Sequence, residues 1–167
     1  IVRGLQPLRP QFQLLVPRIP ARLLDAVLAD ARRARRPDHG RPDNGLNEVL
    51  YQFYHHGRAV QVKKPAQQAT PTSVATDVTT AVADATSIIC DLHSHGNMRA
   101  FFSQTDNADE QGARLYAVIG KLDSEPEMRL RVGVYGYWLP LPLTAFFTNN
   151  GPFKDLHQEK KDDKQRL

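Results

Sequence analysis

The sequence predicts an α/β (α+β) fold in which a single domain contains a mixed β-sheet flanked by helices. Three observations support this fold class. Short apolar runs of strand length recur along most of the chain, between residues that favour turns. Some neighbouring runs resemble the two strands of a hairpin, whereas others are separated by helical patterns. The chain has 167 residues, of which 41% are hydrophobic and 24% charged, a composition typical of one soluble globular domain with its own core.

The first part of the chain predicts one strand and one helix. The strand is expected over residues 12–16. Pro20 suits the first turn of a helix that continues to about Arg36, because apolar residues recur at helical spacing, namely Leu23, Leu24, Val27, Leu28 and Ala31. Residues 38–45 are predicted to be a loop from their composition.

A hairpin is expected next. Its first strand covers residues 48–54, residues 55–57 form the turn, and residues 58–63 alternate as the partner strand. Residues 65–86 are rich in Ala, Thr, Gln and Asp. They predict an edge strand near residues 74–78 and a short helix.

The next segment predicts a buried strand that leads into a helix. Residues 87–92 are largely apolar and follow a polar stretch, which favours a buried strand. Ser103 or Thr105 would act as the N-cap of a helix that continues to about Gly112. The acids at residues 109–110 are expected to be helix N-terminal acids, favoured by the helix dipole.

Two further strands complete the predicted sheet. They are expected over residues 115–122 and 128–138, and two prolines make residues 139–147 irregular or an edge strand. Residues 1–153 are therefore predicted to form the domain. Residues 154–167 are nearly all charged or polar and are expected to be a C-terminal tail, either frayed or a solvated helix.

The net charge is +4 at pH 7, and much of it comes from the run Arg32–Arg36 and from Arg41. This run could contact an acidic partner or DNA. It could instead be the solvated C-terminal end of a helix, where the helix dipole favours basic side chains. We favour the second interpretation because no nucleic-acid motif and no interleaved aromatic residues accompany the run. Nucleic acid is therefore not expected as a partner.

The sequence predicts no association with a membrane. No stretch approaches the ~20 consecutive apolar residues that span a bilayer. Prolines and an arginine interrupt the apolar run at residues 14–16, so this run is no signal-peptide core. Cys90 is the single cysteine and cannot form an internal disulfide, which favours a cytoplasmic location.

The most informative pattern is a pair of histidines followed at fixed spacing by a serine and an aspartate: His93, His95, Ser103 and Asp106. Histidine nitrogens and carboxylate oxygens are the usual ligands of a catalytic zinc, which takes three ligands from the protein. At a strand end, His93 and His95 would project on one side while Ser94 points away. The following helix N-terminus can bring Asp106 back beside them, so these three residues are candidate zinc ligands.

This pattern resembles the motif of the JAMM (MPN+, Mov34/MPN/PAD-1) metalloprotease family, whose full form adds a glutamate well upstream. Glu48 is the only glutamate before the histidines and begins a β-favouring run. The resemblance covers roughly residues 20–138. Within the family, residues 91–96, 101–106 and 131–138 look most like the protein A subfamily of the bacterial PRTRC (ParB-related, ThiF-related cassette) system.

The resemblance implies a single JAMM/MPN-like domain with a cytidine-deaminase-like fold and Zn2+ held by His93, His95 and Asp106. It implies that Glu48 is the general base, which later delivers its proton to the leaving amine. Ser103 would donate a hydrogen bond to the developing oxyanion. The expected enzyme is a zinc metallopeptidase (a deubiquitinase-like isopeptidase) that cuts an amide bond at the C-terminal tail of a ubiquitin-like or sulfur-carrier protein. A ThiF/E1-like protein of the same system is an expected partner.

The alternative function is a non-catalytic MPN scaffold that binds protein partners in the plasmid- or partition-associated PRTRC system. Glu48 favours the enzyme, since a scaffold has no need for a glutamate that does not hold zinc. A third interpretation, a DNA-partition accessory, depends only on the basic run.

Three departures from the family pattern are expected to alter the substrate groove more than the metal site. Gly96 replaces the usual proline after the second histidine and is expected to loosen the backbone. Phe102 replaces the proline that often precedes the motif serine, and Tyr51 replaces a glycine.

Other polar residues near the motif have simpler interpretations. His55 and His56 are adjacent, so on a strand they face opposite sides and at most one could join a site. Cys90 faces away from His93 and is expected to be buried as a small hydrophobic residue. Asp91 shares a face with His93 and either orients an imidazole or lies at the surface.

Overall fold

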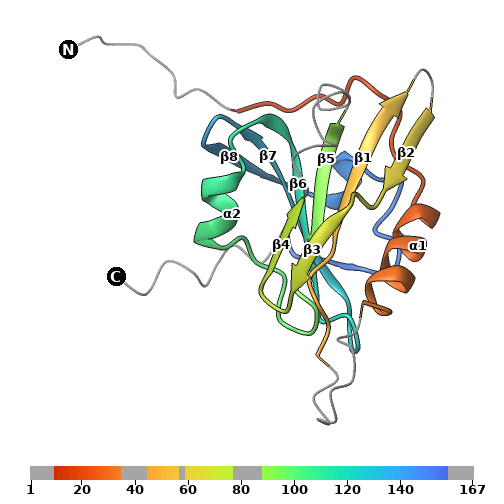
Figure 1. Cartoon of the computed structure of the whole chain (residues 1–167). Coiled ribbons are helices and arrows are strands. Elements are labelled where there is room, and N and C mark those ends of the chain that lie inside the picture. Colours follow the sequence, from red (N-terminus) through yellow and green to blue (C-terminus); the bar gives the residue numbers. More distant parts are fainter. Residues whose placement is uncertain (1–9, 35–44, 57–58, 77–87, 158–167) are drawn as a thin grey trace, which may run out of the picture.

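The computed structural model describes residues 10–34, 45–56, 59–76 and 88–157 (Figure 1). Its strands are β1 (Leu50–His56), β2 (Ala59–Lys63), β3 (Gln67–Thr70), β4 (Ser73–Thr76), β5 (Ile88–Ser94), β6 (Ala113–Gly120), β7 (Glu127–Val134), β8 (Tyr137–Leu141) and β9 (Lys154–Asp155). Seven of them form one sheet in the order β2-β1-β5-β6-β7-β8, with β9 paired to β7, and β3 pairs with β4 separately. Strands β5 and β6 are parallel, whereas β1 is antiparallel to β5. The predicted mixed sheet is confirmed.

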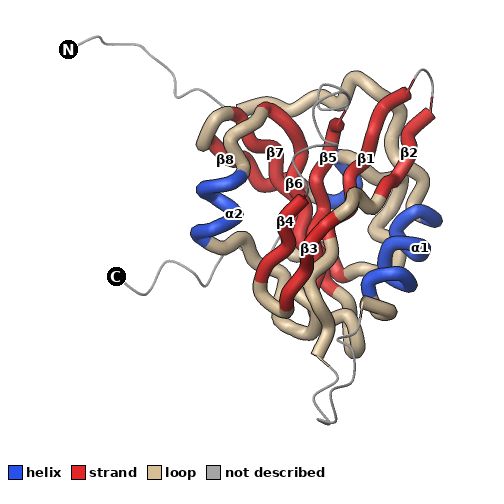
Figure 2. Tube along the Cα trace, in the orientation of Figure 1, coloured by secondary structure: helices blue, strands red, loops and turns tan. Residues whose placement is uncertain are grey.

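In the described residues the sheet is accompanied by the short helices α1 (Arg22–Ala31) and α2 (Gln104–Asp109) and by the 3-10 helix η3 (Leu143–Ala145). Figure 2 shows α1 and α2 on opposite sides of the strands, with the β3–β4 hairpin in front of the sheet between them. This arrangement leaves part of the sheet between α2 and the hairpin, where the candidate site lies.

Side-chain alternation divides the sheet into an apolar and a polar face. On β5, Cys90 and Leu92 are fully buried in the core, as predicted for the cysteine. The same face continues across the sheet, because Cys90 pairs with Phe53 on β1 and with Leu115 on β6, which also belong to the core. His93 therefore lies on the opposite, polar face.

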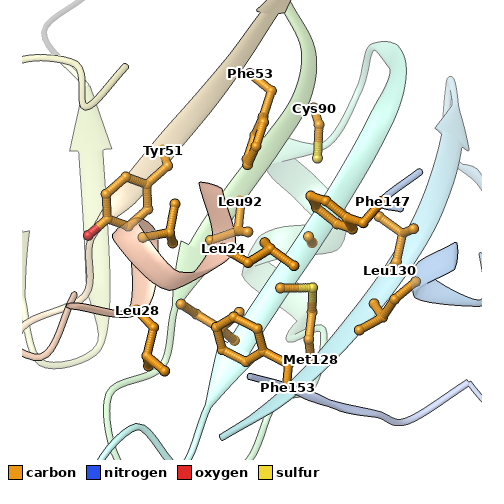
Figure 3. Packing of buried hydrophobic residues seen from close by; sticks show 14 of the residues in the cluster. Leu24, Leu28, Tyr51, Phe53, Cys90, Leu92, Met128, Leu130, Phe147 and Phe153 are labelled. Carbon is orange, nitrogen blue, oxygen red and sulfur yellow. The ribbon is translucent and has the colours of Figure 1, made fainter. Parts of the chain in front are cut away.

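Helix α1 covers the apolar face with the residues that its spacing predicts, Leu24, Val27, Leu28 and Ala31. Aromatic rings fill the centre of this core beside the helix (Figure 3). Phe53, Phe146 and Phe147 pack edge to face, with ring centroids 4.8 to 5.9 Å apart. Such pairs contribute attraction beyond the burial of their area.

The predicted strand over residues 12–16 is wrong. These residues have no strand pairing, although Phe12 and Leu14 pack against the core. A single parallel bridge joins Ile19 to Phe147. Pro17 and Pro20 lack the N–H that a longer ladder around this bridge would need. Phe12 and Leu14 are thus partly buried without a strand, and Leu15 is 87% exposed.

Helix α1 is shorter than predicted and ends at Ala31. The chain leaves the helix at Arg32, whose Nε donates to the carbonyl oxygen of Leu122 (2.6 Å). The basic run thus begins at the helix end as expected, and the Arg33 side chain is 74% exposed, but Arg32 is half-buried rather than solvated. Arg35, Arg36, Arg41 and most of the predicted loop lie outside the described residues.

The expected strand over residues 128–138 is a hairpin. Strand β7 ends at Val134, and β8 begins at Tyr137. Tyr135 and Gly136 between them both have positive φ, 47° and 86°. Two such residues form the tight turns whose twist matches that of the flanking strands. The turn was missed because a tyrosine occupies its first position. Strand β8 pairs with β7 alone among the described strands, which confirms an edge strand in this region.

The polar segment after β2 forms the β3–β4 hairpin, and β4 overlaps only the beginning of the predicted edge strand. Residues 77–87 lie outside the described part of the chain. The predicted hairpin of β1 and β2 is confirmed, but His55 and His56 lie within β1 rather than in the turn.

The expected frayed or helical tail is wrong for its first residues. Lys154 and Asp155 form β9, and Leu156 is fully buried. Leu156 packs with Ala100 and Val118 on the polar side of the sheet. The tail residues 158–167 lie outside the described residues.

The aromatic core provides a test of the fold. Phe53→Ala removes a fully buried ring that contacts two others, so we expect the free energy of unfolding to fall by about 3–5 kcal/mol. Urea unfolding with linear extrapolation measures this change. Tyr137→Ala, at a residue that is 82% exposed, is the control and should change it by less than about 0.5 kcal/mol. Equal effects of the two substitutions would contradict the packing.

Candidate metal centre

The end of β5 places both motif histidines on the polar face. His93 is the next-to-last residue of the strand, and the backbone N–H of His95 donates to the Ile119 carbonyl on β6 (2.8 Å). The two Nε2 atoms lie 3.1 Å apart. Ser94 between them is fully buried on the other side, as strand alternation predicts.

Ser94 ties the histidines to the segment that carries Glu48. Its Oγ accepts from the N–H of Val49, and its own N–H donates to the Val49 carbonyl, both at 3.0 Å. Glu48 precedes β1 by two residues, and its own N–H donates to Thr70 on β3 (2.8 Å). The Glu48 side chain is buried, and Oε1 lies 4.0 Å from Nε2 of His95. The predicted glutamate is therefore brought to the histidines.

Asp106 comes from the first turn of α2. Ser103 is the N-cap, and Thr105 is not. The Ser103 Oγ accepts from the N–H of Asp106 (3.1 Å), while the Asp106 Oδ2 accepts from the N–H of Ser103 (2.5 Å). This reciprocal pair is a capping box with aspartate in place of the usual Glu or Gln. The box turns the carboxylate so that Oδ1 lies 3.2 Å from Nε2 of His93.

The three predicted ligands converge. Their ligand atoms lie within 4.8 Å of one another, and within the described residues they are the one such group of His, Cys, Asp and Glu side chains. Ligands at about 2.0–2.1 Å from a tetrahedral zinc are about 3.3–3.4 Å apart. Two of the three distances are close to this value, since Nε2 of His93 lies 3.1 Å from Nε2 of His95 and 3.2 Å from Oδ1 of Asp106. The third distance, from Nε2 of His95 to Oδ2 of Asp106, is longer, at 4.0 Å. The donor types and their spacing therefore fit a metal ion.

The pKa values of these groups differ with their surroundings. Burial opposes ionisation of Asp106, but hydrogen bonds with His93 and Ser103 outweigh it and hold the pKa of Asp106 well below its ordinary value. Burial raises the pKa of Glu48 to about 7, against the opposite effect of His93. Burial and the neighbouring His93 lower the pKa of His95. Near neutral pH, Asp106 is thus a carboxylate and His95 is neutral, the forms that bind metal.

A groove of about 690 Å³ opens over this cluster. Helix α2 forms one wall and residues 72–76 form another, with the polar face of the sheet between them. Met98 and Phe101 are 43% and 44% exposed and add an apolar part beside His95, whose ring meets that of Phe101 at 4.6 Å between centroids. Consecutive residues of β4 line the groove, as expected where the main chain of an edge strand borders it.

Two ion pairs beside the site were not predicted. Asp91 contacts neither imidazole, and it is no free surface residue, because its oxygens accept from Gln52 (3.0 Å) and Arg114 (2.9 Å). The acids at residues 109–110 are wrongly predicted as helix N-terminal acids. Asp109 is the last residue of α2, and Glu110 is its buried C-cap and accepts from Arg131 (2.7 Å). The partners of both acids lie on other strands, namely Gln52 on β1, Arg114 on β6 and Arg131 on β7, so no local pattern indicated them.

The three departures from the family pattern have structural explanations. Gly96 has φ of +55°, which proline cannot adopt, and a Cβ there would lie 3.1 Å from Cβ of Leu46. The backbone therefore takes a path here that proline would not allow. Phe102 lies under the guanidinium of Arg131 (3.6 Å), and Tyr51 is buried in the core.

Comparison with known families identifies the domain. Residues 20–133 match the family of prokaryotic homologs of the JAB domain, so the chain belongs to this family and to the JAMM/MPN superfamily. No curated protein matches the chain. In the described residues, no helix has the length and apolar character needed to span a membrane.

The capping box predicts a loss of stability in Ser103→Ala. This substitution leaves the N–H of Asp106 without its acceptor, so the free energy of unfolding should fall by about 0.5–2 kcal/mol. Urea unfolding measures the change. Thr105→Ala is the matched control, because Thr105 is exposed and does not cap the helix. An unchanged stability of Ser103→Ala would contradict the cap.

Proposed function

We propose that the protein is a zinc-dependent isopeptidase that hydrolyses an amide bond at the C-terminal tail of a ubiquitin-like or sulfur-carrier protein. One observation carries this proposal: His93, His95 and Asp106 converge in a groove that Glu48 and Ser103 also line. Membership of a family that includes hydrolases and often binds zinc supports it.

Each residue has a separate part in this mechanism. The Nε2 atoms of His93 and His95 and the carboxylate of Asp106 would hold the zinc. When bound, zinc supplies Lewis-acid polarisation of a carbonyl and makes water more acidic. Glu48 lies outside the group of three ligands but only 4.0 Å from Nε2 of His95. It would accept the proton of the attacking water and deliver it to the leaving amine.

Ser103 serves both the helix and the reaction. Its Oγ accepts a hydrogen bond from the backbone N–H of Asp106, and its hydroxyl group also bonds the Asp106 carboxylate. In the reaction, the hydroxyl hydrogen would turn from this carboxylate to the substrate. Because the hydroxyl lines the groove beside Asp106, it can donate to the negative charge that develops on the substrate carbonyl oxygen.

The groove suits an extended peptide. Among the described strands, β4 pairs with β3 alone, and residues 72–76 border the groove opposite α2. An extended tail can add main-chain hydrogen bonds along such an edge. A flexible tail can enter where a folded surface cannot, which favours the C-terminus of a ubiquitin-like or sulfur-carrier protein. The resemblance to PRTRC protein A supports a ThiF/E1-like partner in the same system.

The zinc site has a direct test. Protein purified without chelator is expected to contain about one zinc per chain by elemental analysis, because three ligands converge. His93→Ala and Asp106→Ala should each lose the metal. His55→Ala, at a histidine of β1 outside the cluster, should keep it. Zinc retained in both ligand variants would refute the site.

The role of Glu48 separates an enzyme from a scaffold. Glu48→Gln should keep the zinc and the fold but lower turnover at least ~100-fold, because the base is gone. The assay uses mass spectrometry to follow cleavage of a fusion to a small ubiquitin-like (β-grasp-type) protein, the proposed class of substrate. Weak or no cleavage of ubiquitin chains is expected, because Gly96 and Phe102, which lie beside the site, replace prolines of the family pattern.

The matched control is Asp25→Asn, at an exposed acid of α1, which should leave turnover unchanged. Equal turnover of Glu48→Gln would remove Glu48 from the mechanism. Saturable binding of the fusion without any Glu48-dependent cut would favour the alternative, a non-catalytic MPN scaffold.

A further inference from the structure

Helix α2 carries Asp106 but has little to hold it in place. It has six residues, all described, and none of them is buried. Isolated helices shorter than about 12 residues are marginal in water, so most helical stability comes from packing. The capping box fixes the first turn. The other end of the helix must be held by a contact from elsewhere in the fold.

Arg131 on β7 supplies this contact. Its Nε donates to Oε2 of Glu110, the C-cap (2.7 Å), and its Nη1 donates to Oδ1 of Asn107 within α2 (2.8 Å). Arg131 and Glu110 are each only 6% exposed. The guanidinium lies 3.6 Å from the ring centroid of Phe102 and 4.8 Å from that of Trp138. These contacts depend on the direction of the planar guanidinium as well as on its charge.

Two neighbouring residues on the same face of β7 hold the chain before α2. Glu127 accepts from the N–H of Ala100, and Arg129 donates to the Ala100 carbonyl, both at 2.9 Å. Alternate residues of a strand share a face, so Glu127, Arg129 and Arg131 form one row. The side chains of this row contact the chain between the histidines and the end of α2, at Ala100, Asn107 and Glu110.

We propose that Arg131 is a positioning residue for the metal centre, which sets the place of Asp106 through the C-terminal end of α2. The N–H of Glu110 donates to the carbonyl oxygen of Asp106 (2.9 Å), so a displacement of Glu110 moves the turn that carries the ligand. This role rests on the proposed zinc site, but it concerns the geometry of the ligands and not the identity of the substrate.

Removal of Arg131 would change zinc affinity in opposite directions, depending on whether Arg131 positions Asp106 or acts only through its charge. Arg131 is a buried cation close to the site, and by Coulomb's law its removal alone would strengthen the binding of a second cation. A positioning role predicts weaker binding, because Asp106 is no longer held in place. Contacts that orient metal ligands typically change metal affinity 10–100-fold.

The experiment measures zinc affinity by competition with a chelator in wild type, Arg131→Met, Arg131→Lys and the double variant Arg131→Met with Glu110→Gln. We expect ~10–100-fold weaker binding in all three variants. Lysine keeps the charge but cannot form the two directed contacts. The double variant leaves no unpaired buried carboxylate, so it provides a folded protein for the same measurement in case Arg131→Met alone unfolds.

A second readout uses the protein without metal. Amide hydrogen exchange of Asn107 and Glu110, whose N–H groups bond within and at the end of α2, should accelerate in the Arg131 variants. Exchange in β6, for example at Ala117, should stay slow. A purely global loss of stability would accelerate both regions together and would overturn the proposal.

Arg114→Met is the matched control, because Arg114 also pairs with an acid on the polar face, Asp91 of β5, rather than with α2. Its zinc affinity should equal or exceed that of wild type. Unchanged or tighter zinc binding in the folded Arg131 variants would overturn the role of Arg131 alone. Wild-type protein that takes up no zinc would overturn the whole metal centre, and this role with it.

Discussion

The site depends on holding two carboxylates and two imidazoles together where little water reaches them. Glu48 and His95 are 6% and 4% exposed, and removing such groups from water is costly unless partners or a metal ion compensate. Neighbouring hydrogen bonds fix the backbone beside each group. Ser94 joins Val49 to the end of β5, the N–H of His95 bonds to β6, and Ser103 caps α2. The ligand geometry is therefore set by the fold itself, which is the preorganisation that a metal site requires.

The order of the strands brings these pieces together. Strand β5 lies between β1 and β6, so Glu48 approaches from the β1 side. Parallel pairing of β5 and β6 requires a crossover, and α2 is part of that crossover. Strand β7 is the antiparallel neighbour of β6, and its residue Arg131 contacts the crossover at Asn107 of α2. The segment after His95 is thus held at its start by the sheet, at Ser103 by its cap, and at its end by β7.

Much of the site could be predicted from the sequence because its signals are local. Strand alternation placed His93 and His95 on one face, and cap chemistry placed Asp106 in the first turn of a helix. Glu48 depended on a family resemblance, since its contact with the histidines spans more than forty residues. Arg131 and Glu110 could not be paired by any local rule. The β7–β8 turn was missed because Tyr135 stands at a position with positive φ, and the β3–β4 hairpin because its strands are polar.

The central claim is that His93, His95 and Asp106 hold one zinc ion. X-ray absorption fine structure at the zinc edge of the loaded protein tests it most directly, because it reports the donor atoms themselves. The expected result is scattering from two imidazole rings, with nitrogen and oxygen donors at about 2.0–2.2 Å. Scattering from one imidazole or none would contradict the claim. So would a sulfur donor at about 2.3 Å, since Cys90 is buried on the opposite face of the sheet.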